Sequence, residues 1–393
     1  MTAGPRGHVP LIYLIAGEPS GDLLAARLMV ALRDLTGGEV RFAGIGGEAM
    51  REQGLDSLFP QSDLAVMGLA EVVPRIPAIL RRLRQTVEDI DHQGPDAVVT
   101  VDSWGFTGRV AKRLKKSGST IPRIHYVAPM VWAWKEKRVH QLAARVDRLL
   151  CLLPEEPGYF TKVGLNAVHV GHAVLESGAD RGDGTAFRRR HGIPDEAPLL
   201  CVLPGSRHSE TSRLLPVFSQ TAERLAGTHP GLRLVVPTVD TVAGDVEAWS
   251  WPVPATLVRG AAARYDAFAA SDCALAASGT VALELALAGT PMVIGYRLNA
   301  LTGLIAKRLL KIRYVCLVNL LVDRPVVPEL LLDDCRPDLL AGQIADLMDN
   351  EAARARQKKG AAEALARLGL GGDSPSRRAA REILTVINGR RMT

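Results

Sequence analysis

Short runs of apolar residues alternate along the chain with segments in which apolar residues recur at helical spacing. The runs have about the four to eight residues of a buried strand, and turn residues follow them. Continuous apolar strands separated by helices are typical of parallel sheets that helices cover on both faces. In the first half of the chain we predict a helix at 21–34 and strands at 11–17, 40–47, 96–102, 123–129, 148–154 and 167–172.

The same alternation begins again after a polar stretch at 176–192. Two such series in one chain predict an α/β protein with two Rossmann-like domains, whose parallel sheets face a central cleft. We expect an N-terminal domain over 1–173, a C-terminal domain over 174–355, and a helix at about 365–390 that packs back on the first. The strands predicted for the second series are 199–207, 232–240, 255–260, 272–279 and 291–297.

The composition is that of a globular protein, with a moderate excess of positive charge. Of 393 residues, 47% are hydrophobic and 23% charged, and the net charge is +6. This charge favours an anionic partner: a phosphorylated ligand, a membrane surface or nucleic acid. The five cysteines are far apart, as in a cytosolic protein with reduced thiols. The apolar run at 11–17 is too short for a signal peptide, and no stretch has the roughly 18 apolar residues of a spanning helix. We therefore expect a soluble or membrane-surface protein.

A glycine between two hydroxyl residues stands where a strand in the second half gives way to a helix. Ser278, Gly279 and Thr280 form this turn, and free N–H groups at a helix start favour an anion. Glu284 follows one helical turn later, and a carboxylate there accepts hydrogen bonds from the two hydroxyls of a ribose. The arrangement suits a nucleoside diphosphate. The alternative is a Ser/Thr helix cap beside a surface glutamate.

A second turn of the same kind follows the strand that begins at 199. Gly205 and Ser206 would expose N–H groups, and Arg207 would neutralise a diphosphate by a bidentate contact. The alternative is a loop arginine paired with Glu210. Two strand–turn–helix sites in one domain favour a diphosphate ligand.

The first half carries acidic residues after two of its strands. Glu18 follows the first strand and faces the predicted cleft, and Ser20, Gly21 and Asp22 would cap the helix after it. The stretch is not a G-x-G-x-x-G fingerprint, so we do not expect a nicotinamide cofactor. Asp102 ends the strand at 96–102, where it is either a helix N-cap or a general base whose proton affinity burial raises.

Three segments combine apolar or aromatic residues with basic ones. Trp132 lies among lysines and arginines at 131–141, a mixture that suits single-stranded nucleic acid, an anionic amphiphile or simple packing. The segments 64–86 and 298–322 have the pattern of helices on an anionic membrane. Ordinary core packing is the alternative for each, but together they favour a membrane-surface enzyme. The residues predicted to contact membrane or acyl chains are Met67, Val72, Val73, Ile76, Ile79, Leu80, Arg81 and Arg82.

From about residue 12 to 345 the order of motifs resembles one family, the lipid-A-disaccharide synthases. The matching stretches are AGEPSGD, DLAVMGLAEV, IHYVAPMVWAWKEKR, VGH, LPGSR..E, ASGTVALE, PMVIGYR and YVCLVNLL. The resemblance implies an inverting hexosyltransferase of the GT-B type that needs no metal or other cofactor. It implies transfer of 2,3-diacylglucosamine from UDP-2,3-diacylglucosamine to 2,3-diacylglucosamine 1-phosphate (lipid X). The products are the β-1,6 lipid A disaccharide 1-phosphate and UDP.

The resemblance also implies where such an enzyme works and what it meets. The place is the cytoplasmic face of the inner membrane of a Gram-negative bacterium, where the protein lies peripherally in lipopolysaccharide biosynthesis. We expect no nucleic-acid partner, and relatives that dimerise through the second domain raise the prospect of a homodimer. Other UDP-sugar enzymes of this architecture remain as alternatives: a UDP-N-acetylglucosamine epimerase or a lipid-linked N-acetylglucosamine transferase.

Roles for single residues follow from the same resemblance. Ser278, Gly279 and Thr280 would hold the pyrophosphate, Glu284 the ribose, and Arg207 the charge on the departing UDP.

Further matches concern the donor and the acceptor. Asn319 would touch the donor, and Asp102 would be the base on the acceptor 6-hydroxyl. His125 and His172 would contact sugar or phosphate. One stretch departs from the family pattern Asp-x-Pro-Asp-Phe: residues 102–106 read Asp-Ser-Trp-Gly-Phe, so Asp102 is the one carboxylate left in this loop.

Overall fold

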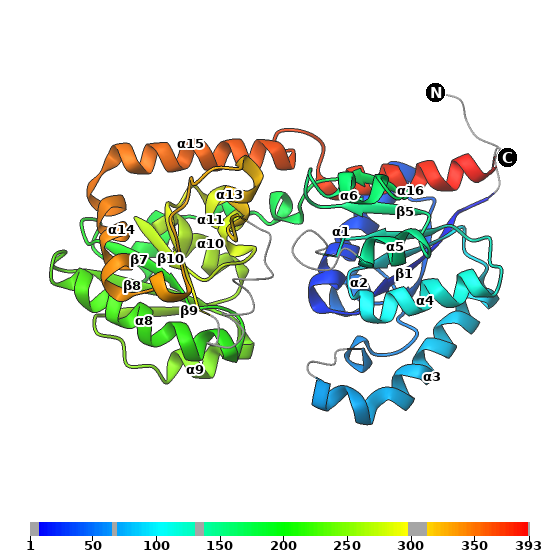
Figure 1. Cartoon of the computed structure of the whole chain (residues 1–393), viewed down its shortest axis with the longest axis horizontal. Coiled ribbons are helices and arrows are strands. Elements are labelled where there is room, and N and C mark those ends of the chain that lie inside the picture. The colour runs from blue at the N-terminus through cyan, green and yellow to red at the C-terminus, as the bar shows by residue number, and fades with distance from the viewer. Residues whose placement is uncertain (1–7, 65–68, 130–136, 298–312, 392–393) are drawn as a thin grey trace. The chain divides into compact units, whose positions relative to one another are not determined.

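The computed structural model describes residues 8–64, 69–129, 137–297 and 313–391 (Figure 1). The chain divides into two compact units, one formed by Met1–Ala173 together with Gly372–Thr393 and the other by Val174–Gly371. The second unit therefore extends beyond residue 355 of the sequence prediction and includes a long helix, α15 (Glu351–Leu368), which contacts other helices of that unit.

The first unit is built on a parallel sheet in the order β2-β1-β3-β4-β5-β6. Its strands fall within or beside the predicted apolar runs, because each run supplies consecutive side chains to two buried faces. Their bounds are β1 (Leu11–Ala16), β2 (Arg41–Ile45), β3 (Ala97–Val101), β4 (Arg123–Tyr126), β5 (Arg148–Cys151) and β6 (Asn166–His169).

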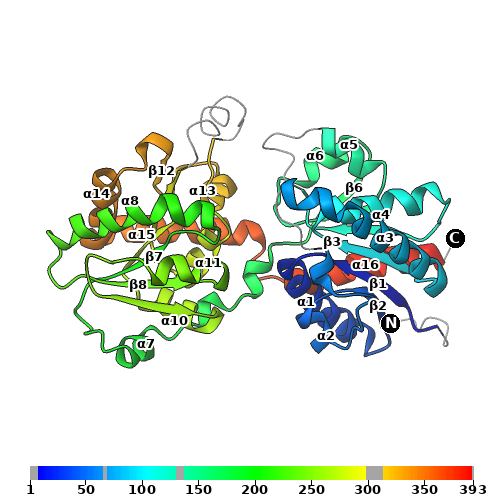
Figure 2. The same cartoon turned by 90° about the horizontal axis from the view of Figure 1, so that it is seen from below.

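Helices cover both faces of this sheet (Figures 1 and 2). Alternate residues of β1 point to opposite faces: Ile12 and Leu14 join a core with α1 and α16, whereas Tyr13 and Ile15 join a core with α3 and α4. The helix bounds are α1 (Pro19–Thr36), α2 (Glu48–Glu52), α3 (Leu69–Gln93), α4 (Trp104–Lys116), α5 (Lys137–Ala143), α6 (Pro157–Thr161) and α16 (Pro375–Arg391).

Helix α16 belongs to the first unit although the whole second unit precedes it in the chain. It lies beside α1, and Ala379, Ala380, Ile383 and Ile387 are buried in the core that α1 and β1 share (Figure 1). Arg148 of β5 also pairs with Glu382 of α16. The hydrophobic core on this face of the first sheet is thus completed by a helix from the C-terminal end of the chain.

The second unit repeats the plan with a parallel sheet in the order β12-β11-β10-β7-β8-β9. Leu200 and Val202 of β7 join a core with α8 and α14, and the opposite face lies against α10 and α11 (Figure 2). The strands are β7 (Leu199–Leu203), β8 (Arg233–Thr238), β9 (Ala255–Arg259), β10 (Cys273–Ala276), β11 (Met292–Tyr296) and β12 (Glu329–Leu331). The remaining helices are α7 (Gly184–Arg190), α8 (His208–Ala226), α9 (Ala243–Glu247), α10 (Ala261–Ala270), α11 (Val281–Ala288), α13 (Leu317–Val322) and α14 (Pro337–Asp349).

In each sheet the strand order reverses at one point, and this point locates a ligand site. In the first sheet the reversal lies between β1 and β3, and in the second between β7 and β10. Open parallel sheets bind ligands beyond the carboxyl ends of strands at such a point. The loops after β1 and β3, and after β7 and β10, are therefore the places where the fold leads us to look.

The α/β class and the parallel strands confirm the prediction from the sequence. The five cysteines are all buried and unpaired. Among the described residues, the search found no helix with both the length and the apolar character that crossing a membrane requires.

Candidate functional site

In the first unit, the loops after β1 and β3 meet at the carboxyl edge of the sheet. The Ser103 hydroxyl donates a hydrogen bond of 3.1 Å to Glu18 Oε1. Gln61 holds the same loop from the other side, because its Nε2 donates to the carbonyl oxygens of Ala16 and Glu18 at 2.9 and 3.1 Å. Glu18 and Asp102, which lie 84 positions apart in the sequence, thus come together at the strand reversal.

The backbone at Asp102 adopts a conformation that is unusual for its residue types. Asp102 and Ser103 have φ values of 50° and 44°, and Val127 at the end of the neighbouring β4 has a φ of 81°. Positive φ is tolerated by Asp but costs a β-branched residue such as Val about 1–3 kcal/mol. Strained residues of this kind gather at functional sites, where the surrounding fold holds them.

The Asp102 carboxylate lies in an environment suited to a base. Burial raises the pKa of Asp102, and the nearby Glu18 charge raises it further, while a hydrogen bond from the Ser103 backbone opposes the rise. A carboxylate whose proton affinity is raised is a better acceptor for the proton of a hydroxyl.

Trp104, which departs from the family pattern, has a structural role beside this loop. Its ring meets the ring of His125 edge to face, with centroids 4.9 Å apart. Gly108, one helical turn later, leaves room for the indole, because a Cβ at that position would lie 2.7 Å from Trp104. The tryptophan and the glycine therefore form a matched pair on α4.

Asp22 does not point into the ligand site. Its side chain is buried and accepts hydrogen bonds from the backbone N–H groups of Gly47, Ala49 and Met50 at 2.7, 2.9 and 3.2 Å. It therefore caps the short helix α2. Ser20, Gly21 and Asp22 were expected to cap the helix after β1, but they lie inside the first turn of α1, which starts at Pro19. The exposed Ser20 and the buried Gly21 remain near the β1 loop.

The two histidines predicted to touch sugar or phosphate occupy interior positions. His125 is 1% exposed, its Nδ1 lies 2.7 Å from the Thr100 hydroxyl, and burial lowers its pKa to about 3. The ring is enclosed in this structure, and its buried Nε2 has no hydrogen-bond partner among the described residues. Contact of His125 with sugar or phosphate therefore stays a prediction. His172 is half-buried, and burial lowers its pKa to about 4, which keeps it uncharged.

In the second unit, the loop after β7 is closed by its own glutamate. Glu210 is buried, and its Oε2 accepts a hydrogen bond of 2.9 Å from the Ser206 N–H. Its Oε1 lies 3.3 Å from Arg207 and 3.5 Å from the Tyr296 hydroxyl at the end of β11. The Ser206 N–H, which the sequence analysis expected to be open to a ligand, therefore already donates to Glu210. Gly205 has a φ of 112°, and a Cβ there would lie 2.6 Å from Glu210.

The contact with Glu210 leaves most of Arg207 accessible. The ion pair is the alternative that the sequence offered, and it exists, but the Arg207 side chain is 68% exposed. An exposed guanidinium that one carboxylate already orients retains donors for an anion.

The turn after β10 lies next to this loop. Ala277 donates to the carbonyl of Leu203, which joins the end of β10 to the end of β7. Gly279 and Thr280 are exposed, and space beyond Gly279 is open, whereas the Ser278 hydroxyl donates 3.1 Å to the carbonyl of Val315. The two turns that the sequence singled out therefore adjoin at the strand reversal.

Glu284, one turn into α11, is not a surface residue. Its side chain is 14% exposed and forms an ion pair of 3.0 Å with Arg264, and the Tyr265 hydroxyl donates to it at 3.3 Å. Burial raises the pKa of Glu284, and the charge of Arg264 and the bond from Tyr265 oppose that rise. The sequence did not reveal Arg264 or Tyr265, because nothing in the spacing of α10 and α11 marks this contact.

Asn319 was predicted to touch the donor, but its amide is fully occupied by the fold. Its Nδ2 donates to the carbonyl of Val327 and to Glu329, and its Oδ1 accepts from the N–H groups of Val326 and Val327, at 2.7 to 2.8 Å. An asparagine side chain has two donors and two acceptor sites. All four are used within the described part of the chain. Direct contact of Asn319 with the donor stays a prediction, and the bonds show a structural role for this side chain.

The network around Asn319 still leads to the donor turn. Glu329 accepts from the N–H groups of Val315 and Cys316, at 2.9 and 3.1 Å, and the Val315 carbonyl accepts from Ser278. Asn319 and Glu329 thus fix the backbone at Val315 and Cys316, and the Ser278 side chain is bonded to this backbone. Glu329 is a further residue that the sequence analysis missed.

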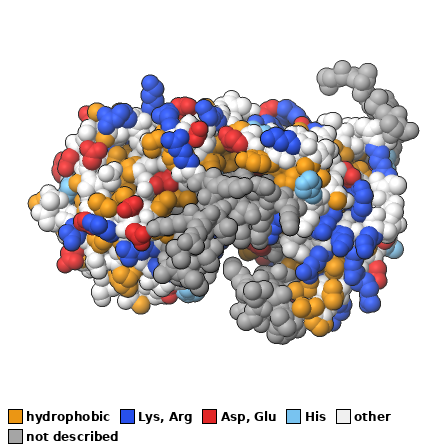
Figure 3. Space-filling model, viewed as in Figure 1, with side chains coloured by type: hydrophobic (Ala, Val, Ile, Leu, Met, Phe, Trp, Pro, Cys, Tyr) orange, Lys and Arg blue, Asp and Glu red, His pale blue; other side chains and the backbone are white. Residues whose placement is uncertain are grey.

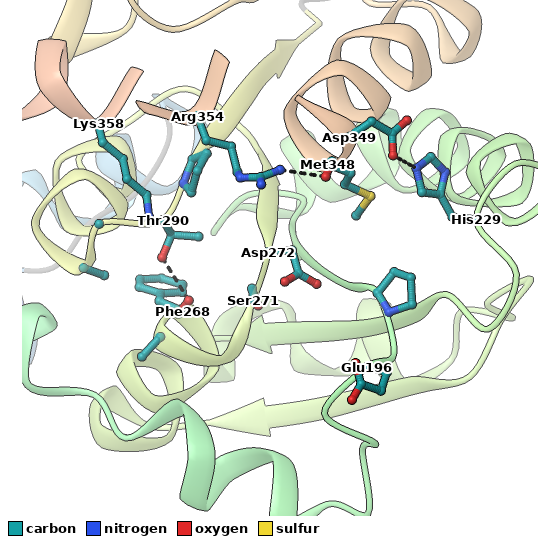
Figure 4. Close-up of a pocket in the computed structure, with 15 residues that line it drawn as sticks. Glu196, His229, Phe268, Ser271, Asp272, Thr290, Met348, Asp349, Arg354 and Lys358 are labelled. Carbon is teal, nitrogen blue, oxygen red and sulfur yellow. Dashed lines mark hydrogen bonds and ion pairs between the residues drawn. The ribbon is translucent and has the colours of Figure 1, made fainter. Parts of the chain in front are cut away.

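A cavity of about 490 Å³ lies at the opposite end of the second sheet, next to the amino ends of β7, β10 and β11 (Figure 4). Its polar residues bond within the fold: Arg354 donates to the Leu347 and Met348 carbonyls, and His229 lies 3.2 Å from Asp349. Because ligands of such sheets bind at the carboxyl ends of the strands, we assign the site to the two turns and not to this cavity.

The residues predicted to meet lipid are only partly described. Met67 and Trp132 lie outside the described residues, and the side chains of Val72 and Val73 are not described, although both positions are in α3. On α3, Ile76 and Leu80 are 43% and 45% exposed. Ile79 packs inward, Arg81 is exposed, and Arg82 pairs with Asp63. Within the segment 298–322, α13 is core and not surface: Val318, Leu321 and Val322 are buried.

A metal centre is not indicated by the described side chains, since no group of three or more His, Cys, Asp or Glu residues among them could hold an ion.

Comparison with known proteins adds the family. A family model described as "Lipid-A-disaccharide synthetase" matches residues 12–383. A "Lipid-A-disaccharide synthase" from Paramagnetospirillum magneticum is 58% identical over 381 residues, which cover 96% of this chain and 97% of the relative. A protein of the same name from Rhodospirillum centenum is 55% identical and covers 97% of this chain and 95% of its own.

Solved structures identify the fold. The "S. aureus MnaA-UDP co-structure" superposes with a TM-score of 0.67 at 13% identity, covering 96% of this chain and 97% of that chain. This degree of identity bears on the fold alone. The neighbours share the GT-B arrangement of two Rossmann-like domains, so the predicted fold class is confirmed.

Proposed function

The chain belongs to the lipid-A-disaccharide synthase family, and from this premise we propose that it joins two acylated glucosamine units. The donor would be UDP-2,3-diacylglucosamine and the acceptor 2,3-diacylglucosamine 1-phosphate. The 6-hydroxyl of the acceptor attacks the anomeric carbon of the donor, a β-1,6 bond forms with inversion, and UDP leaves. The match to the family model over residues 12–383 is the observation that carries the proposal.

Asp102 is the base in this scheme. Its carboxylate takes the proton of the acceptor 6-hydroxyl as that oxygen bonds to the anomeric carbon. The strained turn at the strand reversal and the raised pKa of Asp102 both support the assignment. Glu18, bonded to Ser103, supplies part of the negative charge that makes Asp102 more basic.

The second unit would hold the nucleotide. Gly279 and Thr280 are exposed at the start of α11, where backbone N–H groups suit the pyrophosphate, and Glu284 suits the ribose hydroxyls. Arg207 meets the negative charge that grows on the departing UDP, with its guanidinium oriented by Glu210. Asn319 and Glu329 act indirectly, because they fix the segment that supports Ser278.

The lipid substrates imply work at a membrane, and the first unit has a face suited to it. Ile76 and Leu80 are exposed on α3, which packs against α4. Lys112, Lys115 and Lys116 of α4 line an open pocket of about 420 Å³ together with His140 and Arg145. Figure 3 shows Lys and Arg side chains gathered over α4, next to an apolar area over α3. Apolar and cationic groups on one face bind anionic lipid, as on the cytoplasmic face of a bacterial inner membrane.

One experiment tests the proposed reaction. Purified protein is incubated with UDP-2,3-diacylglucosamine and lipid X in detergent micelles, and the products are separated by thin-layer chromatography and identified by mass spectrometry. We expect the disaccharide 1-phosphate and an equal amount of UDP, both dependent on the acceptor. Release of UDP without acceptor, or conversion of UDP-N-acetylglucosamine to an epimer, would assign the chain to another UDP-sugar reaction.

A further inference from the structure

The hydrogen bonds that the Glu284 carboxylate accepts from the described residues all go to one of its two oxygens. Arg264 Nη2 donates a hydrogen bond of 3.0 Å to Oε1, and the Tyr265 hydroxyl donates to the same Oε1 at 3.3 Å. Both contacts come from α10, and the side chains of Arg264 and Glu284 are 27% and 14% exposed. The two carboxylate oxygens therefore differ: Oε1 accepts both hydrogen bonds from α10, and Oε2 accepts neither of them.

Helix α10 is itself held firmly in the second unit, so the contact is made by a fixed element. Tyr265 is 9% exposed and its ring packs near that of Phe268. The backbone of Gly182 lies so close to Tyr265 that a Cβ there would be 2.1 Å from the Tyr265 carbonyl oxygen. Asp266 accepts a hydrogen bond of 2.8 Å from the Asp183 N–H. Groups on rigid, packed elements keep a binding side chain in one orientation.

Glu284 needs hydrogen-bond partners such as Arg264 and Tyr265 because its carboxylate is largely buried. A half-buried carboxylate without a partner loses solvation and would turn toward water or take up a proton. A guanidinium beside it favours the charged form and limits rotation about the last side-chain bond. An ionised carboxylate with one oxygen fixed presents the other as an acceptor for hydroxyl groups.

We propose that Arg264 and Tyr265 are positioning residues that hold Glu284 Oε1, so that Oε2 accepts from the ribose hydroxyls and selects a ribonucleoside diphosphate over its 2′-deoxy form. This inference rests on the proposed function for the choice of a uridine nucleotide. It adds two residues from a helix that none of the sequence motifs includes.

The test compares two nucleotides on the full-length protein. UDP and 2′-deoxy-UDP are titrated by calorimetry into the unaltered protein and into Arg264→Gln, Tyr265→Phe and Arg264→Lys. The matched control is Arg356→Gln, which removes an exposed arginine from α15 in the same unit. A thermal melt of each variant establishes that it is folded.

The unaltered protein should bind UDP more tightly than 2′-deoxy-UDP. Arg264→Gln should lose on the order of 10-fold in affinity for UDP and little for 2′-deoxy-UDP, because a hydrogen bond to a charged group is what it weakens. Tyr265→Phe should lose about 2-fold to 10-fold in the same selective way. Arg264→Lys should retain part of the preference, and Arg356→Gln all of it.

Two results would overturn the inference. If Arg264→Gln and Tyr265→Phe leave the ratio of the two affinities unchanged, the residues do not orient Glu284, whatever happens to overall binding. If the variants lose stability and both nucleotides weaken equally, the role is structural only. Failure of the unaltered protein to bind UDP at all is a separate outcome, which contradicts the proposed function and the inference with it.

Discussion

At Asp102, backbone geometry and electrostatics act on the same carboxylate. The residue takes a positive φ at the carboxyl end of β3, and the loop it starts is tied to Glu18 through Ser103. Burial and the neighbouring charge raise its pKa. The backbone turn thus fixes the position of the Asp102 side chain, and burial together with the Glu18 charge increases the proton affinity of its carboxylate.

Replacing Asp102 by asparagine should separate chemistry from binding. Asparagine tolerates a positive φ and has the same shape, so Asp102→Asn should fold and bind UDP as before. Loss of a general base should lower turnover by about 10²-fold to 10⁴-fold. The measurements are initial rates and a UDP titration, with the exposed Asp56→Asn as control. Near-normal turnover would remove Asp102 from this role.

The pH dependence of the rate offers a second readout for Asp102. A base must be ionised, so the rate falls as pH drops through its pKa, which burial raises from the ordinary value of an aspartate. This acidic limb should be missing from the residual activity of Asp102→Asn.

His125 predicts a pH effect on stability and not on catalysis. Its pKa is about 3 in the folded protein and about 6.5 when exposed. Between about pH 6.5 and 3, His125 is protonated in the unfolded chain but stays neutral in the folded protein. The free energy of unfolding therefore decreases as the pH falls toward about 3. His125→Asn removes this term and should flatten the dependence by up to about 1.4 kcal/mol per pH unit.

Urea denaturation at pH 7.5 and 5.5 measures this difference, with the exposed His92→Asn as control. Equal losses of stability in His125→Asn and the unaltered protein would show that the His125 ring is not kept neutral by burial.

The sequence was informative for single residues where function depends on position along a strand. Glu18, Asp102, Arg207 and Ser278 were predicted as site residues because each lies at the end of an apolar run, and the carboxyl ends of parallel strands share one edge. Contacts between distant positions left no such pattern. Asp22 caps α2, Asn319 spends its amide on Val326, Val327 and Glu329, and Arg264 reaches Glu284; each depends on tertiary packing that spacing does not encode.

At the scale of elements, strands were easier to predict than the surfaces of helices. Short apolar runs bounded by turn residues predict strands that are buried on both faces. An amphipathic helical pattern fits contact with a membrane and contact with the protein core equally well. Helix α13, within a segment predicted to lie on lipid, is core. On α3 the pattern divides: Ile79 faces the core, and Ile76 and Leu80 face outward.

The exposed pair on α3 should contribute to membrane binding. Ile76→Ser with Leu80→Ser removes two apolar side chains, each worth about 1.5–3 kcal/mol when fully buried, so binding to vesicles should fall at least about 10-fold. The measurement is sedimentation with vesicles that contain anionic phosphatidylglycerol. Leu339→Ser with Leu370→Ser removes similarly exposed leucines from the second unit and serves as control. Equal binding by the two double variants would contradict a docking role for α3.

At the scale of the whole molecule, the chain leaves the first unit after Ala173 and returns to it after Gly371. The returning helix supplies Ile383, which is fully buried beside α1. The sequence analysis expected a helix at about 365–390 that packs back on the first domain, and α16 does lie against α1. The individual contacts could not be predicted, because they join opposite ends of the sequence.

Ile383→Ala should therefore weaken the first unit and spare the second. Deleting buried methyl groups from a close-packed core costs about 2–5 kcal/mol. Limited trypsin digestion, followed by mass spectrometry, should release peptides from residues 8–173 earlier than peptides from residues 174–371. Thr385→Ala, on the exposed side of α16, is the control. Digestion of both units at equal rates would argue against separate stability.

The return of α16 has a consequence for the order in which the protein matures during translation. When Ala173 leaves the ribosome, the nascent first sheet still lacks the helix that covers its α1 side. Roughly 200 further residues must be added first, a wait on the order of 10–40 s at an elongation rate of about 5–20 residues per second. Throughout that interval the apolar surface that α16 will cover is accessible to chaperones. The second unit can fold during this time, and α16 is synthesised only after it.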